Sequence, residues 1–266
     1  MSWSGAGPAP RLVAVRARLG LVVALCAVAA VGWVWSAREM RGMDTGPWTG
    51  LGSLGWFLGV WLLMMTAMMF PSVAPTIALY TRVTKDSSPL APWLFVGGYL
   101  LSWAVAGLGA YAIGAAAVTG FGDTLAWDRA GRGLAAATLV AAAVYEVTPF
   151  KDVCLARCRS PLGSLLGSWR GGPTGSLQMG ARNGIWCVGC CWALMASLFA
   201  LGVMSVSWMA FVAAIIALEK TLPLGRRVTW PVAGLLLVLG VLLLVAPDAL
   251  PGLTVPSGRP MQPMMG

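Results

Sequence analysis

The hydrophobic residues of this chain fall into long runs without a charged side chain, and most of these runs are long enough to cross a membrane. A spanning helix needs about 20 apolar residues, because each residue rises about 1.5 Å and the hydrocarbon core of a bilayer is about 30 Å thick. Residues 183–218 would form a helix about 54 Å long, so we expect two helices joined by a turn near Gly202–Ser207. The sequence therefore predicts seven spans, at about residues 19–37, 52–70, 93–118, 133–150, two within 183–218, and 228–247.

Two of these spans need a further interpretation. Residues 19–37 could be a secretory signal peptide, but the run is too long for one and lacks a small-residue cleavage site before a soluble domain. We therefore interpret it as a membrane anchor. We expect the second helix to end at Phe70 and to continue as an irregular extension through Pro71 and Pro75, because proline interrupts helical hydrogen bonding.

Lysine and arginine are divided unevenly between alternate loops, and this division predicts the orientation of the chain. With the N-terminus inside, the inner segments hold 13 of the 18 basic residues and the outer segments hold five. The predicted fold is an all-α, polytopic transmembrane helix bundle, N-in and C-out. We expect a disordered basic N-terminus over residues 1–18, one membrane-embedded domain over residues 19–247, and a disordered, methionine-containing tail over residues 248–266.

The composition supports a membrane protein and excludes several kinds of chemistry. Hydrophobic residues make up 58% of the chain and charged residues 10%, whereas about a quarter of a soluble domain is charged. The lipid bilayer is thus the expected surrounding, and the net charge of +9 reflects topology rather than a nucleic-acid surface. There is no glycine-rich phosphate loop for a nucleotide. The absence of histidine excludes Ser-His-Asp triads, imidazole metal sites and histidine-ligated haem.

The first segment with candidate chemistry is MMTAMMFP, at the predicted inner end of the second span. Met64 and Met68 are four residues apart, as are Met65 and Met69, so four thioethers would cover adjoining faces of a helix. The alternative is that these methionines are adaptable packing residues.

The second segment is YEVTPFKDVCLARCRSP. Glu146 lies in the fourth predicted span, where a carboxylate is costly and usually marks a site, although Lys151 could simply neutralise it at the interface. Cys154 and Cys158 are four residues apart and would share one face of a helix. Neighbouring basic residues favour the thiolate form that binds metal.

The third segment is CVGCCWALM, which contains Cys187, Cys190, Cys191 and Met195. A C-x-x-C pair at the start of a helix brings two sulfurs within reach of one ion. A structural disulfide is the alternative for any such pair, but the cytosolic side of a membrane is reducing. Cys26 stands alone in the first span and is interpreted as a small core residue.

Five of the six cysteines thus lie at the predicted inner ends of two spans joined by one loop. This arrangement suits either a metal site or a dithiol redox centre. Thiolate and thioether ligands without imidazole favour Cu(I), and zinc in an all-thiolate site is the competitor. The methionine pairs favour copper, because thioether adds little for zinc.

Together, the three segments and the Glu219–Lys220 pair resemble a family of predicted bacterial metal-binding integral membrane proteins, often labelled copper chaperones. The resemblance covers about residues 56–223 and rests on the CxxxCR and CxxCCW elements. It implies a multi-pass protein of the bacterial inner membrane concerned with copper. The family often has histidine at the position of Asn183 and glutamine at that of Glu146, so a sulfur-only site is implied here. The implied positions are Cys154, Cys158, Cys187, Cys190, Cys191, Met64, Met65, Met68 and Met69.

The sequence therefore predicts a non-enzymatic membrane protein that binds Cu(I) through Cys and Met on the cytoplasmic side. It would move copper across the membrane or deliver it to a cuproenzyme, with a copper chaperone as a further partner. Two alternatives remain open. One is a membrane thiol–disulfide oxidoreductase that uses Cys187–Cys190 with Cys154–Cys158 as a relay. The other is a structural subunit or assembly factor of a membrane oxidase or monooxygenase, with structural zinc.

Overall fold

The computed structural model describes nine parts of the chain, and every statement on structure below concerns these residues: 23, 27–35, 38, 52–84, 88–121, 130–160, 169–201, 206–222 and 226–246. Their regular structure is entirely helical, so the predicted all-α class is confirmed for the described residues. The helices are α2 (Leu54–Val83), α3 (Ala91–Phe121), α4 (Arg132–Glu146), α5 (Pro149–Arg159), α7 (Gly172–Leu201), α8 (Val206–Thr221) and α9 (Arg226–Val245). Residues 27–35 are helical as well.

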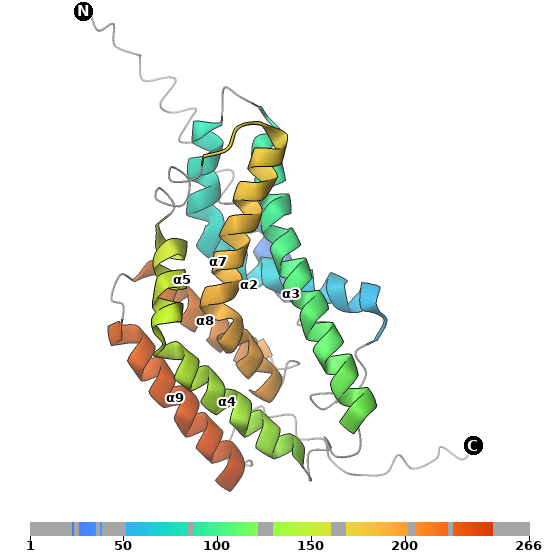
Figure 1. Ribbon diagram of the computed structural model, residues 1–266, viewed down its shortest axis with the longest axis vertical. Coiled ribbons are helices and arrows are strands. Elements are labelled where there is room, and N and C mark those ends of the chain that lie inside the picture. The colour runs from blue at the N-terminus through green and yellow to red at the C-terminus, as the bar shows by residue number, and fades with distance from the viewer. Residues whose placement is uncertain are drawn as a thin grey trace, which may run out of the picture.

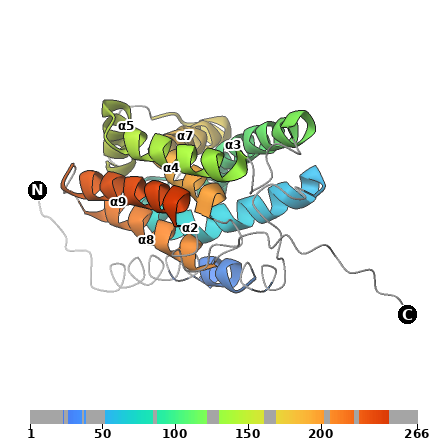
Figure 2. The same ribbon diagram turned by 90° about the horizontal axis from the view of Figure 1, so that it is seen from below.

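Helix α7 lies at the centre of the bundle. It packs most extensively on α3 and also contacts α4, α5 and α8 (Figure 1). Helix α2 packs on α3 and α8, while α4 and α9 lie side by side, as both views show (Figure 2). The residues that bear the candidate chemistry are therefore collected around one central helix.

Helix α2 continues to Val83 with Pro71 and Pro75 inside it, so the predicted end at Phe70 is wrong. Proline removes a helical hydrogen bond, but helices in membrane proteins tolerate this when neighbouring polar groups and helices compensate. Here α2 is packed against α3 and α8. The consequence is that Met69 stays in the middle of a long helix.

The predicted fourth helix instead ends at Glu146, and α5 starts at Pro149 after a bend of 68°. Thr148 is extended at the bend, and its hydroxyl accepts the Lys151 N–H at 3.3 Å. Threonine is a favoured N-cap and proline a favoured first helical residue, while the residue before proline avoids the α conformation. The bend makes α5 a separate helix with its own packing on α7.

Helix α7 starts at Gly172, before the predicted Asn183, because Arg182 is accommodated within the helix. Helix α7 ends at Leu201 and α8 starts at Val206, and residues 202–205 of the predicted turn lie outside the described residues. By length and composition, α2, α3 and α9 can each cross a membrane, and α4 with α5 adds a fourth span if the bent pair counts as one. The seven spans and the N-in orientation stay predictions. Of the first predicted span, residues 23 and 27–35 are described, and the rest, with Cys26, lies outside the described residues.

Glycines allow α3 and α7 to approach each other closely. A Cβ atom added at Gly98 would lie 2.0 Å from the Leu177 carbonyl oxygen, and one added at Gly180 would lie 1.9 Å from the Phe95 carbonyl oxygen. Small residues of this kind let membrane helices pack backbone to backbone. Any side chain at these positions would push the two helices apart.

We therefore expect Gly98→Ala to destabilise the protein by about 1–3 kcal/mol, the usual cost of overpacking, in spite of the better helix propensity of alanine. The measurement is the thermal unfolding midpoint in detergent. Gly97→Ala is the matched control, because its added Cβ would meet nothing closer than Leu177 Cδ1 at 4.0 Å. Equal midpoints for the two variants would contradict the close approach.

Candidate metal centre

Three cysteine sulfurs meet where α5 packs on α7. The Sγ atoms of Cys158, Cys187 and Cys190 all lie within 4.8 Å of one another, and those of Cys190 and Cys158 are 3.6 Å apart. Cys187 and Cys190 are buried, whereas Cys158 is partly exposed. We call this group the three-cysteine cluster. Its geometry can hold one metal ion of a size and type that thiolates bind.

Local sequence explains how the cluster forms. Cys187 and Cys190 are one helical turn apart on α7, so their side chains project from the same face. The bend at Thr148 directs α5 along α7, and Gly189 gives it room, since a Cβ atom there would lie 2.9 Å from Cys154 Sγ. The two cysteine motifs, which the sequence placed only at the same side of the membrane, therefore meet in space, with Cys158 rather than Cys154 in the cluster.

Helices α2 and α8 complete the surroundings of Cys187. Its Sγ atom lies 3.9 Å from Met69 Sδ and 3.0 Å from Lys220 Nζ. Lys220 Nζ also lies 3.5 Å from Met69 Sδ and 3.4 Å from Ser72 Oγ. A positive charge at this distance favours the thiolate form of Cys187. Met69 is the predicted methionine that reaches the cluster.

Tyr99 is a site residue that the sequence did not single out. Its hydroxyl lies 3.1 Å from Cys187 Sγ, and either atom can donate the hydrogen. It is buried together with Phe95 and Trp103, its neighbours at four-residue spacing on α3. That spacing signals only a packed face, so sequence alone could not distinguish Tyr99 from an ordinary core aromatic. Lys220 likewise entered the sequence analysis only as part of the Glu219–Lys220 pair of the family resemblance, not as a neighbour of the cysteines.

The remaining predicted sulfur ligands are buried nearby but lie outside the three-cysteine cluster. Cys191 Sγ donates to the Cys187 carbonyl at 2.8 Å, and Cys154 packs toward Gly189. Met64, Met65, Met68 and Met195 belong to the hydrophobic core around the cluster. Their role as metal ligands stays a prediction, and their burial also fits the packing alternative.

Glu146 forms a buried ionic group instead of joining the cysteines. Lys151 Nζ pairs with both the Glu146 carboxylate and the Glu219 carboxylate, the latter at 2.8 Å. Arg159 Nε donates to the Glu219 backbone carbonyl at 2.6 Å. We call Glu146, Lys151 and Glu219 the ionic triad. Because Glu219 precedes Lys220, α8 joins the triad directly to the surroundings of Cys187.

The chain matches a known protein family. The family model described as PpoB2, copper chaperone, matches residues 58–243, which is more than half of the chain. No curated protein matches this chain, and no solved structure matches it.

Proposed function

We propose, for a chain that belongs to the PpoB2 copper chaperone family, that the three-cysteine cluster binds one Cu(I) ion and passes it on within the membrane. The observation that carries this proposal is the convergence of the Cys158, Cys187 and Cys190 sulfurs within 4.8 Å. The bound copper would then be transferred across a bacterial inner membrane or delivered to a cuproenzyme.

The donor set favours copper over zinc. Structural zinc sites are almost always four-coordinate with thiolate, imidazole or carboxylate ligands, and the cluster supplies three thiols. A thioether is also close, since Met69 Sδ lies 3.9 Å from Cys187 Sγ, and thioether suits Cu(I). The absence of histidine from the sequence leaves sulfur as the only soft ligand type.

The residues around the three-cysteine cluster suit a metal ion that is bound and then released. Cys158 is the partly exposed member of the cluster, so it is the sulfur that an incoming or outgoing ligand reaches first. Lys220 Nζ lies 3.0 Å from Cys187 Sγ and balances its negative charge when no metal is bound. A bound cation has to compete with this ammonium group, which lowers the affinity and favours exchange. Such a site serves transfer better than permanent storage.

One observation favours the thiol–disulfide alternative. The Cys158 and Cys190 sulfurs are 3.6 Å apart, so a modest movement of α5 would bring them to the bonding distance of about 2.05 Å. The pair that this geometry favours bridges α5 and α7, whereas the sequence suggested Cys187–Cys190. A redox function predicts reversible loss of two thiols without any requirement for metal.

The experiment is the metal content of the detergent-purified protein under reducing conditions after exposure to Cu(I) and Zn(II) together. We expect about one copper per chain and little zinc. Cys154→Ser should keep this copper, because Cys154 shares α5 with Cys158 but lies outside the cluster. Bound zinc would support the structural-subunit alternative. Absence of metal combined with reversible oxidation of Cys158 and Cys190 would support the oxidoreductase.

A further inference from the structure

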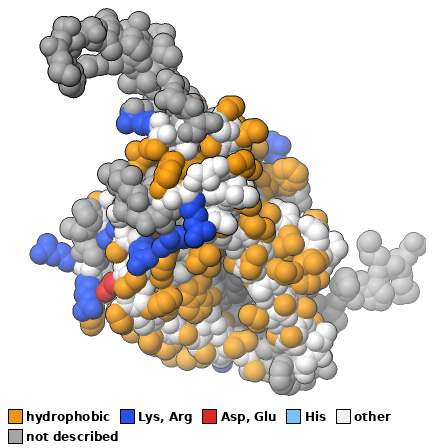
Figure 3. All heavy atoms as spheres, turned by 45° about the horizontal axis from the view of Figure 1, so that its top comes forward, with side chains coloured by type: hydrophobic (Ala, Val, Ile, Leu, Met, Phe, Trp, Pro, Cys, Tyr) orange, Lys and Arg blue, Asp and Glu red, His pale blue; other side chains and the backbone are white. Residues whose placement is uncertain are grey.

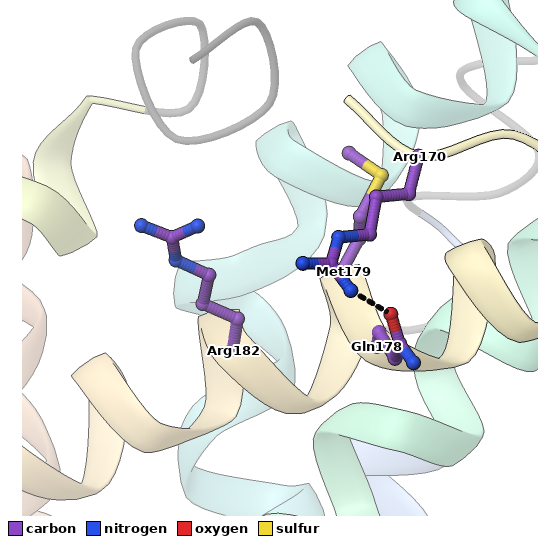
Figure 4. Close-up of a pocket in the computed structure, with 4 residues that line it drawn as sticks. All are labelled: Arg170, Gln178, Met179 and Arg182. Atoms are coloured by element: carbon purple, nitrogen blue, oxygen red, sulfur yellow. Dashed lines mark hydrogen bonds between the residues drawn. The ribbon is translucent and has the colours of Figure 1, made fainter. Parts of the chain in front are cut away.

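A small cavity of about 200 Å³ lies at the start of α7, away from the three-cysteine cluster. It is lined by Arg170, Gln178, Met179 and Arg182, which Figure 4 shows on one side of the α7 ribbon. Arg170 Nη1 donates to Gln178 Oε1 at 2.5 Å, which leaves the amide nitrogen of Gln178 free to donate elsewhere. Among the lining residues none is acidic, so the cavity presents an excess of positive charge.

The two arginines lack a carboxylate partner. Within the described parts of the chain, the ion pairs involve Lys151 and Arg226, and the Arg182 guanidinium has no hydrogen-bond partner. An arginine fork binds two oxygens of a phosphate or carboxylate group at once. The unpaired guanidinium groups therefore offer a site for a polyoxygen anion.

Packing fixes the backbone that carries Arg170. The adjacent Trp169 ring lies 5.9 Å from that of Tyr80, and the Tyr80 hydroxyl donates to Ser176 Oγ at 2.8 Å. Gly175 lets the backbone at Arg170 pack against the first turn of α7, since an added Cβ at Gly175 would lie 2.4 Å from the Arg170 carbonyl oxygen. The cavity is thus anchored to the last turns of α2.

The same contacts set the depth of the cavity relative to a bilayer. Tyr80 is near the end of α2 and Ala91 begins α3, and both helices are candidate spans. The cavity therefore lies at the level where these spans end, which is the level of lipid headgroups. Trp169 and Trp93 are exposed here, by 42% and 71%, as is usual for tryptophan at a membrane interface. Figure 3 shows several basic side chains on the left half of this face, next to a largely hydrophobic surface.

We propose that this cavity binds the phosphate group of an anionic phospholipid. Basic pockets beside membrane helices recognise such headgroups, and the exposed apolar surface below accommodates the acyl chains. The two arginines and the Gln178 amide would hold the phosphate oxygens, with Met179 as the apolar floor. The bound lipid would hold the start of α7 at the membrane–water interface, whether or not a metal is bound.

The test is lipid binding to the delipidated full-length protein, counted by native mass spectrometry. We expect phosphatidylglycerol to be retained in preference to phosphatidylcholine with the same acyl chains. Arg170→Gln/Arg182→Gln should weaken phosphatidylglycerol binding about tenfold or more. Arg132→Gln/Arg227→Gln, which removes the same charge from the starts of α4 and α9, should leave it unchanged. Copper binding by both variants would show that each is folded.

Three results would overturn the proposal: no preference for phosphatidylglycerol, equal loss in the two double variants, or displacement of the lipid by inorganic phosphate alone. Displacement by phosphate would assign the cavity to a free anion. If the double variant does not fold, the single variant Arg182→Gln is tested in its place, because no described residue forms a hydrogen bond with the Arg182 guanidinium. Retention of full phosphatidylglycerol preference in that variant would also overturn the proposal.

Discussion

Replacing Cys187 with serine should weaken Cu(I) binding by at least about 100-fold. Substitution of residues that only support a metal ligand already lowers affinity about 10–100-fold, and we propose Cys187 as a ligand itself. Its sulfur is also the one that contacts Met69, Tyr99 and Lys220. A serine hydroxyl is a poor ligand for Cu(I) and does not ionise beside Lys220 as a thiol does. Competition with a chromogenic Cu(I) chelator in detergent measures the dissociation constant.

Cys191→Ser is the matched control for this experiment. Cys191 is on the same helix and is equally buried, and its Sγ donates to the Cys187 carbonyl, but it is not one of the three sulfurs that lie within 4.8 Å of one another. We expect it to keep Cu(I) affinity within a few-fold of the original chain, because serine can make the same hydrogen bond. If Cys191→Ser lost copper as completely as Cys187→Ser, the ligand set would be the wider one that the sequence suggested.

Spacing along single helices was readable from the sequence, and contacts between helices were not. The i, i+3 relation of Cys187 and Cys190 predicted two sulfurs on one face, and both belong to the cluster. The choice of Cys158 over Cys154 depends on the rotation of α5 against α7, which a single sequence does not specify. Lys220 is 33 positions from Cys187, and only the packing of α8 reveals their contact.

The element boundaries that were wrong have different causes. Pro71 was expected to end α2, but a buried helix in a bundle tolerates proline. Arg182 was taken to precede a helix, although an arginine can lie on a helix that is exposed on that side. The bend before Pro149 did have a signal, the Thr-Pro pair of a capped helix start, which a hydrophobicity count overlooks.

Replacing Lys151 with methionine should destabilise the protein by about 3–5 kcal/mol, the cost of removing one partner from a buried ion pair. Lys151 and Glu146 are fully buried, and Lys151 Nζ pairs with two carboxylates at once. Without the ammonium group, Glu146 and Glu219 would face each other with no cation between them. We expect a large fall in the amount of folded protein and in its thermal midpoint in detergent.

Arg226→Met is the control, because it breaks an exposed ion pair between α9 and Asp152, the residue that follows Lys151 on α5. Arg226 Nε lies 3.4 Å from Asp152 Oδ2, and both side chains are exposed, so this pair contributes at most about 1 kcal/mol. The triple variant Lys151→Met/Glu146→Gln/Glu219→Gln should recover much of the lost stability, since it removes the unpaired carboxylates together with the lysine. Equal midpoints for Lys151→Met and Arg226→Met would show that the ionic triad does not stabilise the fold. Suppose instead that the triple variant recovers its thermal midpoint and still binds copper. Helix α8 would then have two separate roles, stability through Glu219 and charge balance at Cys187 through Lys220.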